Sequence, residues 1–205
     1  MGFLMKTDVC KLLIMRFLNV PEFRNVSLKC LTEIAGITGE SAKEYETEYI
    51  ELYQATITEL KKMLPTDIDL KKAYNTGKDS QQAFIQNLAL FLETYLKNYA
   101  ELAERNCKAE LLDGIRYLVK ISEVEETEVF KVCLEFWHSL SGDLYKEAPN
   151  QQIYHQGLLG FNNTPVSTPG ALLTLNVSLY CVCRSLMIIS GVTESEATSV
   201  ARCCR

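Results

Sequence analysis

The sequence predicts an all-α fold in which antiparallel helix pairs stack as a segment of a HEAT/armadillo-type right-handed solenoid. First, apolar residues recur at helical spacing through nearly all of residues 1–149. Second, short loops separate these helices, and no strand pattern interrupts them. Third, helix pairs recur at intervals of about 40–50 residues, a period typical of HEAT repeats, whose units bury their apolar faces against their neighbours. A closed helix bundle is the alternative that the same pattern leaves open.

The ends of the predicted helices follow from their apolar stripes and from Pro and Gly residues. The helices are expected over residues 3–18, 21–36, 42–64, 80–104, 108–121 and 127–146. Pro21 suits the first turn of the second helix, because its missing N–H has no partner there in any case. Gly36 suits the C-terminal cap of that helix. The segment AYNTGKDS (73–80) predicts a turn that pivots on Gly77.

Each helix carries one stripe of apolar residues that we expect to be buried. The stripe of the second helix is Phe23, Val26, Cys30, Leu31 and Ile34. The next two stripes are Tyr45, Tyr49, Leu52, Tyr53, Ile57, Leu60 and Leu64, then Phe84, Leu88, Phe91, Leu92, Tyr95, Leu96 and Tyr99. The last two are Leu111, Ile115 and Leu118, then Phe130, Cys133, Trp137, Leu140 and Leu144. The tyrosines at 45, 49 and 53 are expected to pack between helices rather than to bind a ligand.

The overall charge argues against nucleic-acid binding. The 205 residues carry a formal net charge of −5, whereas binding to phosphates needs clustered Lys and Arg. The first 18 residues hold Lys6, Asp8 and Lys11 within an apolar run and no small-residue cleavage site, so they do not resemble a signal peptide. The eight cysteines form no C-x-x-C pair, and we expect free thiols in a reducing compartment.

The chain changes in composition at Asn150. Residues 150–205 hold only three of the 21 Lys+Arg and two of the 26 Asp+Glu residues. NTPVSTPG (163–170) has the composition of a linker. The apolar segment 171–190 is as long as a membrane span, but Asn176 and Arg184 within it argue against one. We therefore expect a poorly ordered tail or one that arises from an error in the gene model.

No constellation of catalytic, cofactor-binding or metal-binding residues is found, so the sequence predicts that the protein is not an enzyme. Cys133 and His138 are five residues apart on one helix and therefore point in different directions. We expect His138 at the surface. Four cysteines of the tail do not have a recognised zinc-site spacing. They are Cys181, Cys183, Cys203 and Cys204.

One acidic run, SEVEETE (122–128), offers two interpretations. Carboxylates stabilise the N-terminus of a helix, and these stand where the last predicted helix begins. Alternatively, they form an acidic strip that contacts a basic partner. The candidate partner-binding residues are Glu123, Glu125, Glu126 and Glu128.

Four ordered segments resemble the exportins, the importin-beta (karyopherin) family receptors for leucine-rich nuclear export signals. The segments are FLNVPEFRNVSLKCLTEIAG (17–36), LKKMLP (60–65), AYNTGKDSQQAFIQNLALFLETYLK (73–97) and SEVEETEVFKVCLEFWHSLSGDLYKEAP (122–149). The resemblance covers about residues 1–149 as an internal fragment: the end of one HEAT repeat, two full repeats and the start of another. Residues 37–49 depart from the family pattern, and residues 150–205 do not match it.

The resemblance implies a scaffold part of a nuclear export receptor, far shorter than a whole family member. Such receptors carry export-signal cargo out through nuclear pores together with Ran-GTP. The implied partners are therefore Ran-GTP, export-signal cargo and nuclear pore proteins, with no direct contact to nucleic acid or membrane. The implied location is the nucleus and cytoplasm, with passage at the nuclear envelope and pore. The family's reactive groove cysteine and acidic loop have no counterpart here. The alternative is a small helical adaptor without transport activity.

Overall fold

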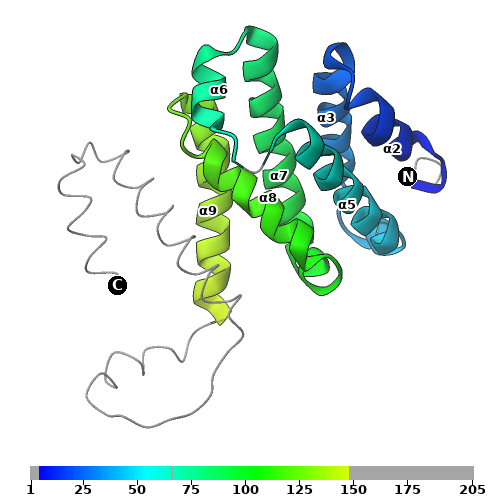
Figure 1. The fold of residues 1–205 in the computed structure, drawn as a ribbon. Helices are drawn as coiled ribbons and strands as arrows, with labels where there is room; N and C mark the ends of the chain where they lie inside the picture. The colour runs from blue at the N-terminus through cyan, green and yellow to red at the C-terminus, as the bar shows by residue number, and fades with distance from the viewer. Residues whose placement is uncertain (1–4, 66, 148–205) are drawn as a thin grey trace, which may run out of the picture. The chain divides into compact units, whose positions relative to one another are not determined.

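The computed structural model describes residues 5–65 and 67–147. The chain divides into two compact units, Met1–Cys133 and Leu134–Arg205, and most of the described residues belong to the first. Every regular element in the described residues is a helix, as Figure 1 shows. The predicted all-α fold is therefore confirmed.

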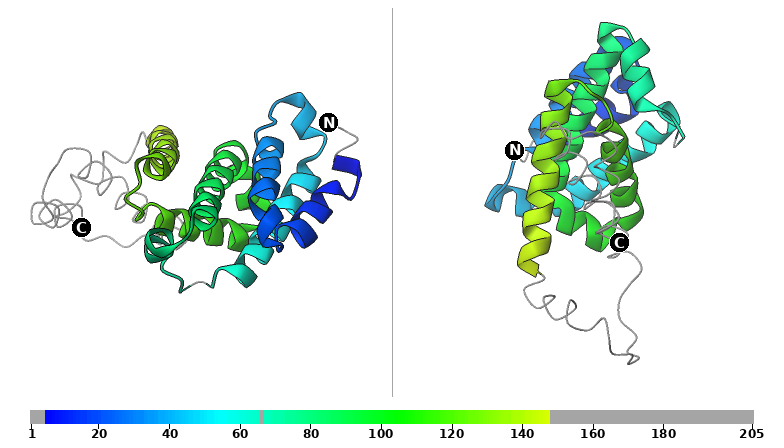
Figure 2. Two further views of the ribbon diagram at one scale, coloured as in Figure 1. Left: turned by 90° about the horizontal axis from the view of Figure 1, so that it is seen from above. Right: turned by 90° about the vertical axis from the view of Figure 1, so that its left-hand side faces the viewer.

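The long helices of the first unit form two layers. They are α3 (Pro21–Ala35) and α7 (Asp79–Asn106) in one layer, and α5 (Glu46–Met63) and α8 (Lys108–Ile121) in the other. Helices α3 and α7 run side by side in Figure 1 and in the left view of Figure 2. They are parallel, because Asn25 near the start of α3 donates to the Ser80 carbonyl at the start of α7, and Asn98 donates to the Ala35 carbonyl at the end of α3. The two helices thus occupy equivalent places in the layer.

The two layers run in opposite directions. Tyr53 of α5 stacks on Tyr95 of α7, and Tyr49, one turn earlier in α5, stacks on Tyr99, one turn later in α7. This reversed order shows that α5 and α7 are antiparallel. Antiparallel pairs arranged side by side are the HEAT-type organisation that the sequence predicts.

The predicted stripes of α5 and α7 are confirmed residue by residue. All seven predicted residues from Tyr45 to Leu64 are buried, and so are all seven from Phe84 to Tyr99. Helix α7 has one non-helical residue, Tyr99, where it kinks. Burial of an aliphatic or aromatic side chain of this size contributes about 1.5–3 kcal/mol, so this interface is a main source of stability.

The predicted stripe of α3 is wrong on one side. Phe23 and Val26 are 52% and 58% exposed, whereas Ser27 and Leu28 are buried. At about 100° per residue, the buried face is rotated by roughly 100° from the predicted one. The rotation places Ser27 and Leu28 on the buried side of α3. Only Leu31 and Ile34 of the predicted stripe are buried.

The predicted helix 3–18 is interrupted. A turn at Thr7–Asp8 precedes α2 (Val9–Leu12), which passes directly into the π-helical turn η1 (Leu13–Phe17). The amide of Leu18 donates to the Leu13 carbonyl at 2.8 Å, which is the wider π-type spacing. This turn orients Ile14 and Leu18 inward, where both are buried.

Two further boundaries differ from the prediction. The expected helix 42–64 is divided into α4 (Glu40–Lys43) and α5, with a break at Tyr45. The short helix α6 (Leu70–Thr76) was not predicted, and residues 73–76 of the expected turn belong to it. The Asp69 carboxylate caps α6 by accepting from the amide of Lys72 at 2.8 Å. Only Gly77 and Lys78 remain between α6 and α7.

The last two predicted helices are confirmed as α8 and α9 (Thr127–Glu147). Leu111 and Leu118 are buried, and Ile115 is half-buried. In α9 the predicted Cys133 and Trp137 are buried, whereas Phe130 and Leu140 are half-buried. The side chain of Leu144 lies outside the described residues.

Some predictions fall on parts of the chain that the structure does not describe. The linker at 163–170, the apolar segment 171–190 and the tail cysteines all lie there. Within the described helices, none is long and apolar enough to cross a membrane. The four cysteines in the described ranges form no disulfide.

Candidate functional site

The acidic strip, Glu123 with Glu125, Glu126 and Glu128, lies between α8 and the first turn of α9. The Glu126 carboxylate accepts from the amides of Glu128 and Val129, both at 2.9 Å. It thereby caps two N–H groups that have no partner within the helix. This part of the strip stabilises the start of α9, as the helix-dipole interpretation expects.

The other members of the strip are exposed. Glu125 accepts from the Lys71 ammonium of α6 at 2.5 Å, with its side chain 76% exposed. Glu128 accepts from Lys131 at 2.8 Å. Glu123 is exposed in the turn after α8. Exposed ion pairs of this kind contribute little to stability, so the carboxylates stay accessible to a basic partner.

A stack of four tyrosines forms the centre of the α5–α7 interface. The ring centroids of Tyr53 and Tyr95 are 4.1 Å apart, and those of Tyr49 and Tyr99 are 4.3 Å apart. Tyr95 donates to the Tyr49 carbonyl at 3.0 Å, and Tyr49 donates to the Ile34 carbonyl at 3.1 Å. Burial raises the pKa of all four phenols. The tyrosines are therefore packing residues, as predicted.

Tyr53 differs from its neighbours because its hydroxyl has no hydrogen-bond partner although it is buried. It points at Gly114 of α8, where a Cβ atom would overlap the hydroxyl oxygen. Gly114 therefore allows α8 to approach α5 closely. The contact joins one helix pair to the next.

A buried carboxylate, Glu59, joins the turn after η1 to α5. It accepts from Lys62 at 2.6 Å and from the Asn19 amide at 2.9 Å, and the residue is 3% exposed. The bond from Lys62, supported by that from Asn19, lowers the pKa of Glu59 against the opposing effect of burial.

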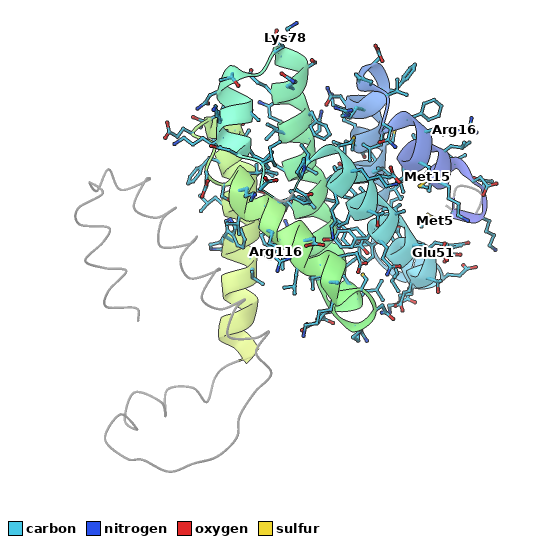
Figure 3. The ribbon with its side chains drawn as sticks, viewed as in Figure 1. Met5, Met15, Arg16, Glu51, Lys78 and Arg116 are labelled. Carbon is cyan, nitrogen blue, oxygen red and sulfur yellow. The ribbon has the colours of Figure 1, made fainter. Side chains whose placement is uncertain are left out.

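A second buried carboxylate, Asp113, joins α5 to α8. Lys61 of α5 approaches one carboxylate oxygen at 2.7 Å, and Arg116 of α8 approaches the other at 2.8 Å. Figure 3 shows Arg116 on the face of α8 turned towards the viewer. Glu59 and Asp113 together form a polar link from the turn after η1 through α5 to α8.

Sequence reasoning missed both carboxylates and the role of Gly114. The spacing of Glu59 to Lys62 and of Asp113 to Arg116 is a local signal for an ion pair. That spacing does not distinguish a buried carboxylate from an exposed one. The close approach at Gly114 depends on a side chain from another helix, so the local sequence carries no signal for it.

Within the described residues no group of His, Cys, Asp and Glu could hold a metal ion. Cys107 is buried, and desolvation raises the pKa of its thiol to about 11. His138 is exposed, as predicted. The side chains brought together in the first unit therefore support packing and surface contact.

Comparison with known proteins relates this arrangement to one family. The chromosome region maintenance or exportin repeat matches residues 109–145, which hold nearly all of α8 and α9. Exportin-1 of Drosophila melanogaster is 40% identical over 159 residues, 77% of this chain and 14% of the relative. Exportin-1 of Schizosaccharomyces pombe is 37% identical over 180 residues, 87% of this chain and 16% of the relative. Protein EXPORTIN 1B of Arabidopsis thaliana is 37% identical over 147 residues, 71% of this chain and 13% of the relative.

The chain belongs to the exportin family. It spans about one seventh of the length of the Drosophila exportin. The whole acidic strip lies inside the matched exportin repeat.

The similarity to the fission-yeast exportin also bears on the tail. A match over 87% of a 205-residue chain is longer than residues 1–149. Similarity to that exportin therefore continues into residues 150–205. The boundary at residue 149 and the division into one partial repeat, two full repeats and the start of another stay predictions.

Proposed function

We propose that this chain is a scaffold segment of a nuclear export receptor, which carries leucine-rich export-signal cargo out of the nucleus with Ran-GTP. The observation that carries the proposal is the repeated antiparallel helix pair, with α3 and α7 in one layer and α5 and α8 in the other. The similarity to proteins named exportin supports it. No observation on the described helices favours a small adaptor instead.

The contacts between the helix pairs support a scaffold role. The tyrosine stack and Gly114 fill the interfaces with side chains, and Glu59 and Asp113 connect neighbouring helices through hydrogen-bonded ion pairs. A solenoid is stable because each unit packs against its neighbours. The segment would thus set the spacing between neighbouring repeats, and it would take no catalytic part.

The implied partners are Ran-GTP, export-signal cargo and nuclear pore proteins, and the implied location is the nucleus and cytoplasm with passage through the pore. Within this segment the acidic strip is the proposed contact for a basic partner surface. Glu123 and Glu125 contribute to it, because both are exposed. Glu126 supports the strip indirectly by capping α9.

A chimeric receptor tests the proposal. Residues 17–147 of this chain replace the matching residues of the fission-yeast Exportin-1 in cells that depend on it. The assay is the nuclear-to-cytoplasmic ratio of a fluorescent reporter carrying a leucine-rich export signal. We expect the chimera to keep the reporter cytoplasmic. A folded, expressed chimera that leaves the reporter in the nucleus would refute the proposal.

The acidic strip is tested separately in the same chimera. Glu123→Gln with Glu125→Gln removes two exposed charges, and Glu51→Gln is the matched control on the exposed side of α5 (Figure 3). We expect the double variant to weaken capture by GTP-loaded Ran or by a nuclear pore protein, and the control to bind as before. Equal binding by both variants would remove the strip from the proposed function.

A further inference from the structure

A group of cations lies at the surface where the C-terminal part of α5 meets α8. It consists of Lys61 and Lys62 of α5 with Arg116 and Lys120 of α8. The side chains of Lys61, Lys62 and Arg116 are 47%, 61% and 69% exposed, and Lys120 is half-buried. We call this surface the cationic face. Its sign is opposite to that of the whole chain, whose formal net charge is −5.

The contact between α5 and α8 holds the cations close together. Lys61 and Arg116 bond to the two oxygens of the Asp113 carboxylate at 2.7 and 2.8 Å. They therefore lie next to each other, although they come from different helices. Lys120 stands one turn after Arg116 on the same side of α8, and it donates to the Ile68 carbonyl at 3.0 Å. The cationic face thus extends from the helix contact towards the end of α8.

The carboxylates of this region lie beneath the cations. Only 10% of the Asp113 side chain and 5% of the Glu59 side chain are exposed. Each carboxylate accepts a bond from one lysine, Asp113 from Lys61 and Glu59 from Lys62. One cation is enough to neutralise a buried carboxylate, so Arg116 adds a surplus charge beside Asp113. The charge that these pairs present to the solvent is therefore positive.

Helix ends account for only part of the cationic face. Lysines in the last turn of a helix stabilise its dipole, and Lys61, Lys62 and Lys120 stand in such turns. Arg116 lies further from the end of α8, where the dipole gives little such gain. The surplus cation is explained if the surface attracts an anionic partner.

An acidic protein segment fits the cationic face better than a nucleic acid does. Asp67 is exposed in the loop after α5, and Glu110 is half-buried in the first turn of α8. These carboxylates would repel a long run of phosphates, whereas a short segment rich in Asp and Glu can bond to the cations between them. We propose that the cationic face binds an acidic segment of a partner protein, whose carboxylates accept from Arg116 and from the two lysines of α5. Arg116 is the member of the face that Figure 3 labels.

Fluorescence anisotropy tests the inference with the full 205-residue chain. The probe is a short fluorescein-labelled polyglutamate peptide, and a Gly/Ser peptide of the same length is the neutral control. We expect saturable binding of the acidic peptide that weakens as NaCl rises from about 0.05 to 0.5 M, because salt screens exposed charges. Equal binding of the neutral peptide, or no binding of the acidic one at low salt, would overturn the inference.

Neutralising substitutions locate the contact. Arg116→Gln with Lys62→Gln removes two exposed cations and leaves each buried carboxylate one of its partners. We expect about tenfold weaker binding of the acidic peptide. Lys29→Gln with Lys97→Gln is the matched control, because it removes two exposed lysines from the layer of α3 and α7. The control should bind as the native chain does, and equal weakening by both pairs would contradict the proposed location.

Two single variants separate the charge of Arg116 from its structural role. Arg116→Gln should weaken binding by about threefold, and Lys61 still pairs with Asp113 in it. Arg116→Lys keeps the charge and should bind within about twofold of the native chain. Circular dichroism shows that each variant is folded. If Arg116→Lys lost binding as fully as Arg116→Gln, charge attraction would not be the cause and the inference would be wrong.

Rival occupants give different results in the same experiments. A single-stranded DNA oligonucleotide of equal charge that binds more tightly than the acidic peptide, and that the same pair of substitutions weakens, would assign the face to nucleic acid. A dimer in analytical ultracentrifugation that this pair abolishes would assign it to a second copy of the chain. Either result would overturn the inference. The inference goes beyond the proposed function, and a chimeric receptor that fails to export would leave it standing.

Discussion

The contact between Tyr53 and Gly114 makes a prediction that depends on a single oxygen atom. The Tyr53 hydroxyl is buried without a hydrogen-bond partner. A buried hydroxyl without a partner lowers the stability by about 1–3 kcal/mol, whereas the cavity left by removing one oxygen atom lowers it by only a few tenths of that amount. Tyr53→Phe should therefore raise the free energy of unfolding by about 1 kcal/mol. The ring itself keeps its stack on Tyr95 at 4.1 Å.

Gly114→Ala should have the opposite effect in the native background. The new Cβ would overlap the Tyr53 hydroxyl oxygen, and the stack on Tyr95 prevents the ring from moving aside. Overpacking lowers the free energy of unfolding by about 1–3 kcal/mol or more, and the higher helix propensity of Ala offsets about 1 kcal/mol of this loss. We expect a net loss of about 2 kcal/mol.

The double variant distinguishes this explanation from a general intolerance of α8. Without the hydroxyl, the nearest Tyr53 atom to the new Cβ is Cζ at 3.2 Å, and Leu92 Cδ2 follows at 3.5 Å. The double variant should therefore be at least as stable as the native chain, with a coupling energy of about 2 kcal/mol. Urea unfolding followed by circular dichroism measures all four proteins. Additive effects of the two substitutions would refute the reasoning.

Three further predictions concern the buried polar and thiol groups. Glu59→Gln should lower the free energy of unfolding by about 1 kcal/mol at pH 7. Because the folded pKa of Glu59 is lowered, its contribution is present above the unfolded pKa and disappears as the pH falls through the folded pKa, so the unfolding curves of the variant and the native chain should converge once the pH is below the folded pKa. Asp113→Ala should lower the free energy of unfolding, measured in urea, by about 1–3 kcal/mol, because Lys61 loses its bond to α8. Lys61→Ala should lower it by less, because Arg116 still pairs with Asp113. Cys107 should react with iodoacetamide at pH 8 far more slowly than the half-exposed Cys30, because Cys107 is 3% exposed and the pKa of its thiol is raised to about 11. Mass spectrometry measures the labelling, and equal labelling of the two cysteines would contradict the burial of Cys107.

The sequence alone predicted the features that repeat along the chain. Helices α5 and α7 carry their large apolar residues on one face each, so their spacing identified both the helices and their buried sides. The tyrosine stripe was assigned to packing for the same reason. The acidic run was placed at the start of α9, and Glu126 caps that helix.

Only the tertiary structure decided which side of α3 is buried and which helices meet. The packed helices bury the small residue Ser27 with Leu28, and they leave Phe23 and Val26 at the surface. A hydrophobic pattern ranks side chains by polarity, whereas burial at a close contact depends also on their size and on the neighbouring helix. Likewise, the need for glycine at position 114 comes from Tyr53, which lies far away along the chain and approaches only when the two helix pairs pack.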